Sequence, residues 1–172
     1  MKLKCLFSKE QIARRVSELA TQISHDYASS KELQVICVLN GSIFFTVDLL
    51  RQLRTPCLLN CVRAKSFHEA GTSDNVDISY GSDIDVSGKD VLIIEDIVDT
   101  GITLHALVDM YHKKNASSVK VCSFLNKKSR HIEDITVDYV GYNIQDEFVV
   151  GYGMDYNNRY RELPYIGYII KD

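Results

Sequence analysis

Apolar residues along the chain fall into two kinds of segment, short strand-like runs and runs with helical spacing. Continuous runs occupy residues 33–39, 57–62, 91–97 and 119–125. Runs of this length and composition predict strands that are buried on both faces of a sheet. Segments with helical spacing separate most of them, and this β-α-β alternation predicts a parallel sheet with right-handed crossovers.

Three helices are predicted, one before the first of these strands and two between strands. The first begins with Ser8-x-x-Gln11, which is the pattern of a capping box. The second begins at Ser42, and the third follows Gly101 and runs to about Lys114. The apolar positions at helical spacing are, in chain order, Ile12, Val16, Leu19, Ile23 and Tyr27, then Ile43, Val47 and Leu50, then Leu104, Leu107, Val108 and Tyr111.

Two stretches depart from this rhythm. Residues 64–75 are polar, have no clear period and carry Gly71, so a binding loop or lid is predicted at about 64–76, before a short strand at 77–81. After Asn126 only strand-like runs remain, at 137–144, 148–152 and 165–170, and this part is rich in tyrosine. We therefore expect one domain over residues 1–172, an α/β fold with a central parallel sheet flanked by helices and a small β-rich C-terminal hood.

Composition narrows the class of protein. The chain has 172 residues, 45% hydrophobic and 25% charged, with a net charge of −3 that argues against general nucleic-acid binding. No apolar run is long enough for a membrane span, and the N-terminus lacks the apolar stretch of a secretion signal. The five cysteines are odd in number and form no CxxC pair, which favours reduced thiols in a cytoplasmic protein over a zinc site.

The candidate chemistry centres on residues 91–104, where the apolar strand runs into Glu95 and Asp96 and then into Asp99-Thr100-Gly101-Ile102-Thr103. These polar groups lie between a strand's C-terminal end and a helix N-terminus, where open α/β sheets bind ligands and where free N–H groups attract anions. Carboxylates would repel a bare phosphate, so a ribose phosphate with a divalent metal fits better. The alternative is a capped turn whose acids are merely solvated.

The segment EDIVDTGITL resembles the phosphoribosyl-pyrophosphate loop of type I phosphoribosyltransferases. Four further segments, in the family's order from about Val35 to Leu163, are similar to its 6-oxopurine branch. The resemblance implies the type I phosphoribosyltransferase fold and transfer of the 5-phosphoribosyl group from phosphoribosyl pyrophosphate (PRPP) to hypoxanthine or guanine, with Mg²⁺ as cofactor. It also implies a homodimer or homotetramer with small-molecule substrates only.

The resemblance assigns roles within the loop. Glu95 and Asp96 would meet the ribose hydroxyls, directly or through Mg²⁺. Asp99 would take a proton from the purine ring, and the segment Thr100, Gly101, Ile102, Thr103 would bind the phosphate. Ile102 stands where many relatives carry a polar residue, but its backbone N–H is unaffected.

Two other segments resemble the pyrophosphate site and its cover. Leu39, Asn40 and Gly41 match the family's pyrophosphate loop, in which a non-proline cis peptide follows the Leu, and Arg161 matches a pyrophosphate-binding arginine. Arg63-Ala64-Lys65-Ser66-Phe67 opens the mobile loop, whose Ser66 and Phe67 match a Ser-Tyr pair. Phe67 keeps the aromatic ring and loses a hydroxyl.

The last segments resemble the base site. Lys127 matches a lysine that contacts the purine 6-oxygen, and an ammonium, which has only donors, suits a 6-oxo group and not a 6-amino group. Phe148 would stack on the purine, and the backbone of Val149 would bind its edge. Asp155 would reach a metal bound to pyrophosphate, so that the implied metal ligands are Glu95, Asp96 and Asp155.

Three other functions remain open at this point. The first is transfer to another base, adenine or xanthine. The second is a regulator that keeps the fold, senses PRPP and binds RNA or DNA, which would need a basic face and no Asp99. The third is a phospho-acceptor domain using Asp96 or Asp99, which would not explain the tyrosine-rich C-terminal part. The sequence does not separate hypoxanthine from guanine.

Overall fold

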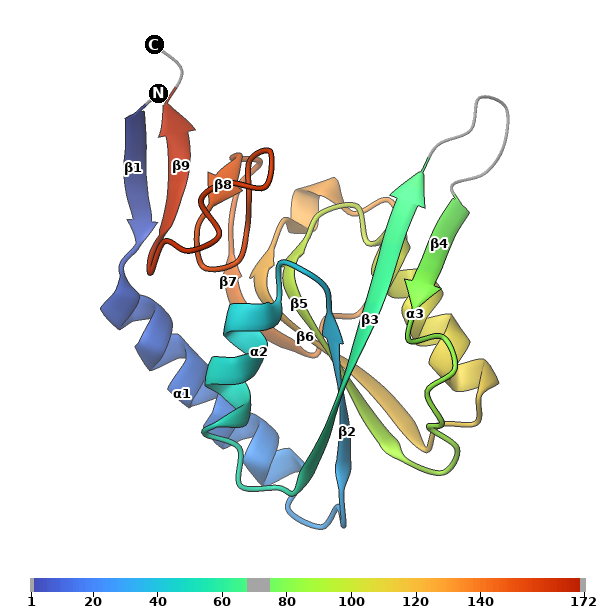
Figure 1. Cartoon of the computed structure of the whole chain (residues 1–172). Helices are drawn as coiled ribbons and strands as arrows, with labels where there is room; N and C mark the ends of the chain where they lie inside the picture. Colours follow the sequence, from blue (N-terminus) through green and yellow to red (C-terminus); the bar gives the residue numbers. More distant parts are fainter. Residues whose placement is uncertain (1, 68–74, 171–172) are drawn as a thin grey trace.

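The computed structural model describes residues 2–67 and 75–170, and its centre is a six-stranded sheet (Figure 1). The strand order is β4-β3-β2-β5-β6-β7, with β2, β3, β5, β6 and β7 parallel and the edge strand β4 antiparallel to β3. This confirms the predicted α/β class. The strands are β2 Leu33–Val38, β3 Cys57–Phe67, β4 Asn75–Tyr80, β5 Asp90–Val98, β6 Ser118–Asn126 and β7 Tyr139–Asn143.

Helices cover both faces of this sheet (Figure 1). Helices α1 (Lys9–Asp26) and α2 (Ile43–Leu50) pack over one face and share a buried cluster with β2, β5 and β6. Helix α3 (Ile102–Lys113) covers the other face, where its Leu104, Leu107 and Tyr111 are buried. A short 3-10 helix, η1, spans Lys128–Arg130. The two-sided burial explains why the central strands are mainly apolar on both faces rather than alternating.

The helix starts show how local sequence sets the elements. The predicted capping box is present, because the Gln11 N–H donates to Ser8 Oγ at 3.3 Å and the Ser8 N–H donates to Gln11 Oε1 at 2.8 Å. In α2 two members of the predicted apolar face, Ile43 and Val47, are exposed, and the third, Leu50, is partly buried against the core. The inward face consists of Phe45, Thr46 and Leu49, since α2 is apolar nearly all round and its own pattern does not choose a side.

A second sheet forms the hood. Its three antiparallel strands lie in the order β1-β9-β8, with β1 at Lys2–Phe7, β8 at Val149–Val150 and β9 at Ile166–Ile170. Strand β1 was not among the predicted elements. The predicted strand at 137–144 is β7, which joins the main sheet beside β6 rather than the hood.

The predicted loop at about 64–76 is partly a hairpin. Residues 64–67 continue β3, and β4 pairs with them, Ala64 opposite Ile78 and Ser66 opposite Val76. Strand β4 has the alternating sequence Asn-Val-Asp-Ile-Ser-Tyr, and its Ile78 packs against the core together with Ala64. The remainder of the loop, residues 68–74, lies outside the described residues.

Two further observations complete the fold. All five cysteines carry free thiols, as predicted. Within residues 2–67 and 75–170 there is no helix both long and apolar enough to cross a membrane.

Candidate active site

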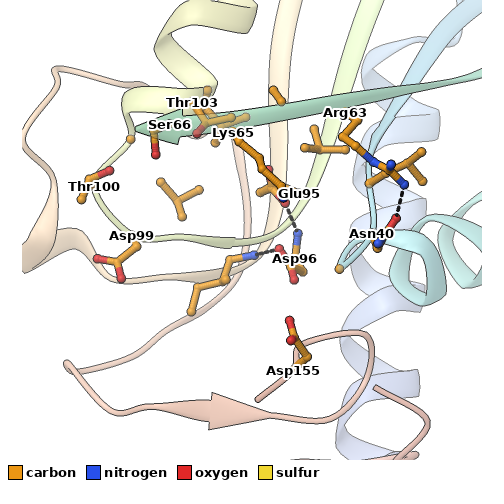
Figure 2. A pocket seen from close by; sticks show the side chains of 18 of the residues that line it. Asn40, Arg63, Lys65, Ser66, Glu95, Asp96, Asp99, Thr100, Thr103 and Asp155 are labelled. Atoms are coloured by element: carbon orange, nitrogen blue, oxygen red, sulfur yellow. Dashed lines mark hydrogen bonds between the residues drawn. The ribbon is translucent and has the colours of Figure 1, made fainter. Parts of the chain in front are cut away.

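The largest group of predicted site residues surrounds one cavity of about 570 Å³ at the C-terminal ends of the central strands (Figure 2). Strand β2 supplies the turn after Val38, β5 supplies its acidic end and the turn to α3, β3 supplies its outer half, and the segment after β8 closes one side. Parallel strands that end at one edge bring these segments together. The predicted residues that line the cavity are Leu39, Asn40, Gly41, Ser66, Glu95, Asp96, Asp99, Thr100, Gly101, Thr103, Asp155 and Arg161.

Glu95 and Asp96 form the floor of the cavity. The Asp96 N–H donates to Glu95 Oε1 at 3.1 Å, and the Ile97 N–H donates to Asp96 Oδ1 at 2.8 Å. Asp96 also lies directly against Gly41, where a Cβ would overlap its carboxylate. A side chain at position 41 would therefore force the Asp96 carboxylate to move.

The turn after β2 contains the predicted cis peptide between Leu39 and Asn40. The Leu39 N–H donates to the Val62 carbonyl at 2.8 Å, which ties the turn to the neighbouring strand. Asn40 Oδ1 accepts a hydrogen bond from Arg63 Nη2 at 3.2 Å across the mouth of the cavity (Figure 2). The turn is thus held from β3 by backbone and side chain.

The start of α3 presents its free N–H groups to the cavity. Gly101 is the N-cap residue, and Thr100 and Thr103 lie on either side with their hydroxyls at the cavity wall. The side chain of Ile102 is buried, so its backbone N–H is the group that could meet a ligand. Free N–H groups and the positive end of the helix dipole make this an anion site.

A pair of opposite charges lies beside the cavity. Asp99 lines it, and Lys127 Nζ is 3.7 Å from Asp99 Oδ2. Lys127 is anchored by its own N–H, which donates to the Val98 carbonyl at 2.9 Å, and its side chain is only 8% exposed. A donor-only group and an acceptor-only group therefore stand side by side at the ends of β5 and β6.

The segment that follows β7 bounds the other side of the site. Asp155 Oδ1 and Arg161 Nη2 form an ion pair at 2.7 Å, and Arg161 Nη1 donates to the Gly153 carbonyl at 2.6 Å. The ring of Phe148 is 55% exposed and meets Tyr156 edge-on, with centroids 5.7 Å apart, while Val149 is buried. Phe148, Val149 and Lys127 are not among the residues that line the cavity, although Lys127 contacts Asp99, which does. Phe67 ends β3, and its side chain lies outside the described residues.

Comparison with known proteins identifies the family. The family model described as the phosphoribosyl transferase domain matches residues 4–157. The chain belongs to the phosphoribosyltransferase family. Its curated relatives include hypoxanthine-guanine phosphoribosyltransferase of Streptococcus thermophilus, 39% identical over 166 residues, which are 95% of this chain and 91% of the relative. Hypoxanthine phosphoribosyltransferase of Salmonella typhimurium is 39% identical over 167 residues, 96% of this chain and 94% of the relative.

Solved phosphoribosyltransferases share the whole fold. The crystal structure of a hypoxanthine-guanine phosphoribosyltransferase from Bacillus anthracis superposes with a TM-score of 0.92 at 38% identity, covering 98% of this chain and 100% of that one. The family membership and the fold implied by the resemblance are thereby confirmed.

The acidic floor of this phosphoribosyltransferase fits a magnesium ion. The pKa of Glu95 is raised well above its usual range, first because burial disfavours the carboxylate and then because Asp96 lies beside it. A bound cation would offset both effects, because it favours the charged form of each carboxylate. Among the described residues no three acidic, His or Cys side chains form a metal cage by themselves. Mg²⁺ characteristically takes one or two carboxylates together with substrate oxygens, so Glu95, Asp96 and Asp155 could hold it with PRPP.

Glu95→Gln is expected to stabilise the ligand-free phosphoribosyltransferase while impairing its activity. Because the folded pKa of Glu95 lies above that of the unfolded chain, its stabilising contribution is present at low pH and is lost as pH rises through the folded pKa. The variant cannot ionise, so its melting temperature should exceed that of the wild type at pH 8 and approach it near pH 5. Loss of a charged hydrogen-bond acceptor should lower kcat/KM about 10- to 100-fold.

Glu10→Gln supplies a control of opposite sign. The pKa of Glu10 is lowered, first by its hydrogen bond from Ser8, so its contribution is present at neutral pH and is lost on acidification. Its replacement should lower the melting temperature slightly at pH 8 and leave activity unchanged. Scanning calorimetry from pH 5 to 9 compares the melting temperatures of the two variants. If both changed with pH in the same way relative to the wild type, the raised pKa assigned to Glu95 would be contradicted.

The structure adds site residues that the sequence interpretation did not assign. Arg63, Lys65 and Asn158 line the cavity, and Asp146 and Arg130 contact the pair formed by Lys127 and Asp99. Arg63 and Lys65 belong to the recognised segment that opens the loop, so their position was a usable signal. Asn158 has a positive φ of 60° in a turn, a conformation that Asn tolerates. Asp146 begins the segment around Phe148 that resembles the base site, so its position was also a usable signal, whereas nothing local marked Arg130.

Proposed function

We propose that this protein transfers the 5-phosphoribosyl group of PRPP to hypoxanthine or guanine, giving IMP or GMP and pyrophosphate in purine salvage. The observation that carries the choice of base is the 3.7 Å approach of Lys127 Nζ to Asp99 Oδ2. A 6-oxopurine presents the acceptor O6 beside N7, which carries a proton in the reactive tautomer. The lysine–aspartate pair has the complementary order, donor beside acceptor, whereas the 6-amino group of adenine would face the ammonium donor to donor.

The phosphoribosyl group is assigned to the start of α3 and the end of β5. The 5-phosphate would lie on the free N–H groups from Thr100 to Thr103, with the threonine hydroxyls as further donors. The ribose hydroxyls would then reach Glu95 and Asp96 on the cavity floor. Carboxylates accept hydrogen bonds from hydroxyl groups, so this order suits a sugar phosphate better than a free phosphate.

In the reaction, purine N9 forms a bond to ribose C1, and the bond from C1 to the pyrophosphate oxygen breaks. Asp99 takes the proton that leaves N7, a step typically worth about 10²- to 10⁴-fold. Asn40, Gly41 and Arg161 hold the leaving pyrophosphate, which the forked donors of an arginine suit. When bound, Mg²⁺ neutralises charge on the pyrophosphate. We assign Ser66 and Phe67 to a cover that excludes water, which would otherwise capture the sugar.

An ultraviolet assay tests this function directly. The protein is incubated with Mg²⁺ and PRPP, and hypoxanthine, guanine, xanthine and adenine are offered in parallel. We expect nucleotide formation with hypoxanthine or guanine and none with adenine. Binding of PRPP without reaction on any base would instead favour the regulator, and reaction with adenine would refute the role of Lys127.

We also propose that the protein is a cytoplasmic homo-oligomer. Helix α2 turns Ile43, Phe44 and Val47 outward, and the start of β3 exposes Leu58 and Leu59, so apolar side chains gather on two consecutive elements. A second copy of the chain would bury them. Sedimentation velocity should give a mass of two or four times 19.5 kDa, and a single chain would contradict self-association.

A further inference from the structure

Four charged side chains form a closed ring of alternating sign beside the cavity. Lys127 Nζ is 3.7 Å from Asp99 Oδ2 and 3.3 Å from Asp146 Oδ1. Arg130 Nε is 2.9 Å from Asp99 Oδ1, and Arg130 Nη1 is 3.3 Å from Asp146 Oδ2. Every member thus contacts two partners of opposite charge, so that moving one changes the surroundings of two others.

The ring joins the ends of three neighbouring parallel strands. Asp99 follows β5, Lys127 and Arg130 follow β6, and Asp146 follows β7. The backbone fixes the middle of the ring, because the Lys127 N–H donates to the Val98 carbonyl and the Arg130 N–H donates to the Lys127 carbonyl at 2.8 Å. Asp146 lies two residues before Phe148 and so connects the charge ring to the segment assigned to the purine.

Lys127 needs a second carboxylate for a physical reason. Its side chain is only 8% exposed, and a buried ammonium is costly unless it is paired. In the proposed reaction Asp99 accepts a proton and loses its charge, so Asp99 alone would leave the ammonium unpaired at that moment. Asp146 has no proton to take from the purine and keeps its charge throughout.

We propose that Asp146 is a positioning residue for base recognition, holding the Lys127 ammonium where it meets a 6-oxo group, with Arg130 linking Asp146 to Asp99. The inference rests on the proposed function. Without the Asp146 charge the ammonium would turn toward its remaining partner, Asp99. It would then pair with the carboxylate that must accept the purine proton and leave the 6-oxygen without its donor.

Asp146→Asn tests this role with little change of shape. We expect KM for hypoxanthine and guanine to rise about tenfold, since a charge-assisted hydrogen bond is lost. KM for PRPP should stay unchanged, and kcat/KM for hypoxanthine and guanine should fall by a similar factor. The matched control is Asp109→Asn, because Asp109 also pairs with a lysine, at 3.6 Å, and its side chain is likewise 55% exposed.

Asp146→Glu, which restores the charge, should recover much of the base affinity. Equal KM values for the base in wild type and Asp146→Asn would overturn the proposal. So would general damage to the protein, in which kcat falls, the KM values for base and PRPP both rise and the melting temperature drops, with no recovery in Asp146→Glu. Those results would leave the proposed function standing if the wild type transfers to hypoxanthine or guanine. A wild type that uses neither base would refute the proposed function and this inference with it.

Discussion

Asp99→Asn is expected to lower kcat by about 10²- to 10⁴-fold, because an amide cannot accept the proton that leaves purine N7. The side chain keeps its size and can still accept a hydrogen bond from Arg130, which lies 2.9 Å away. Binding of PRPP should change little, since we assign the phosphate and ribose contacts chiefly to Glu95, Asp96 and the start of α3. Steady-state kinetics with PRPP and hypoxanthine varied separately measures both effects.

The melting temperature distinguishes the loss of the proton acceptor in Asp99→Asn from damage to the structure around it. The carboxylates of Asp99 and Asp146 raise the pKa of Arg130, the hydrogen bond to Asp99 being the largest cause. Arg130 is half exposed and keeps Asp146 after the substitution, so the melting temperature should hardly move. An unchanged kcat would remove Asp99 from the role of base. If KM for PRPP rose by the same factor by which kcat falls, the substitution would have disturbed the whole loop from Glu95 to Thr103.

Local sequence was sufficient wherever a single segment determines its own structure. The capping box at Ser8 and the helical spacing after it set α1, and the continuous apolar runs set β2, β5 and β6. The acidic turn after β5 was predictable for the same reason, since its apolar strand, its glycine and its amphipathic helix are consecutive. Parallel strands that end at one edge then place Lys127 near Asp99 without further information.

Local sequence was insufficient where contact with a distant segment determines the structure. Strand β1 is a short run that becomes a strand only because β9, more than 150 residues later, pairs with it. Helix α2 is apolar on both sides, so packing against β5 and α1 chooses the buried face. Asp146 lies in the loop after β7 and Arg130 ends the short helix η1, and their meeting depends on where β7 joins the sheet.

Two turns approach each other closely at glycines on the side of the cavity that we assign to pyrophosphate. Gly41 touches the Asp96 carboxylate, and the Gly41 carbonyl in turn lies against Gly153. The Gly153 N–H donates to the Arg161 carbonyl at 3.0 Å, and the Gly153 carbonyl accepts a hydrogen bond from Arg161 Nη1. The floor, the turn after β2 and the arginine assigned to pyrophosphate are therefore in contact one after another.

Gly153→Ala should break this chain of contacts. Gly153 has a φ of +101°, which L side chains rarely adopt, and a Cβ there would overlap the Gly41 carbonyl oxygen. The strained backbone and the overlap together should cost about 2–5 kcal/mol of the free energy of unfolding. Displacement of the turn by even about 1 Å should lower kcat/KM about 10²-fold, because transfer requires aligned reactants.

Gly88→Ala separates backbone strain from the overlap. Gly88 also has a positive φ, +68°, but a Cβ there meets nothing within 4 Å. Its replacement should cost about 1–2 kcal/mol and leave activity unchanged. Chemical denaturation and steady-state kinetics of both variants complete the comparison. If Gly153→Ala retained the activity of Gly88→Ala, the turn after β2 would not need its contact with the hood, and the pyrophosphate site would have to lie elsewhere in the cavity.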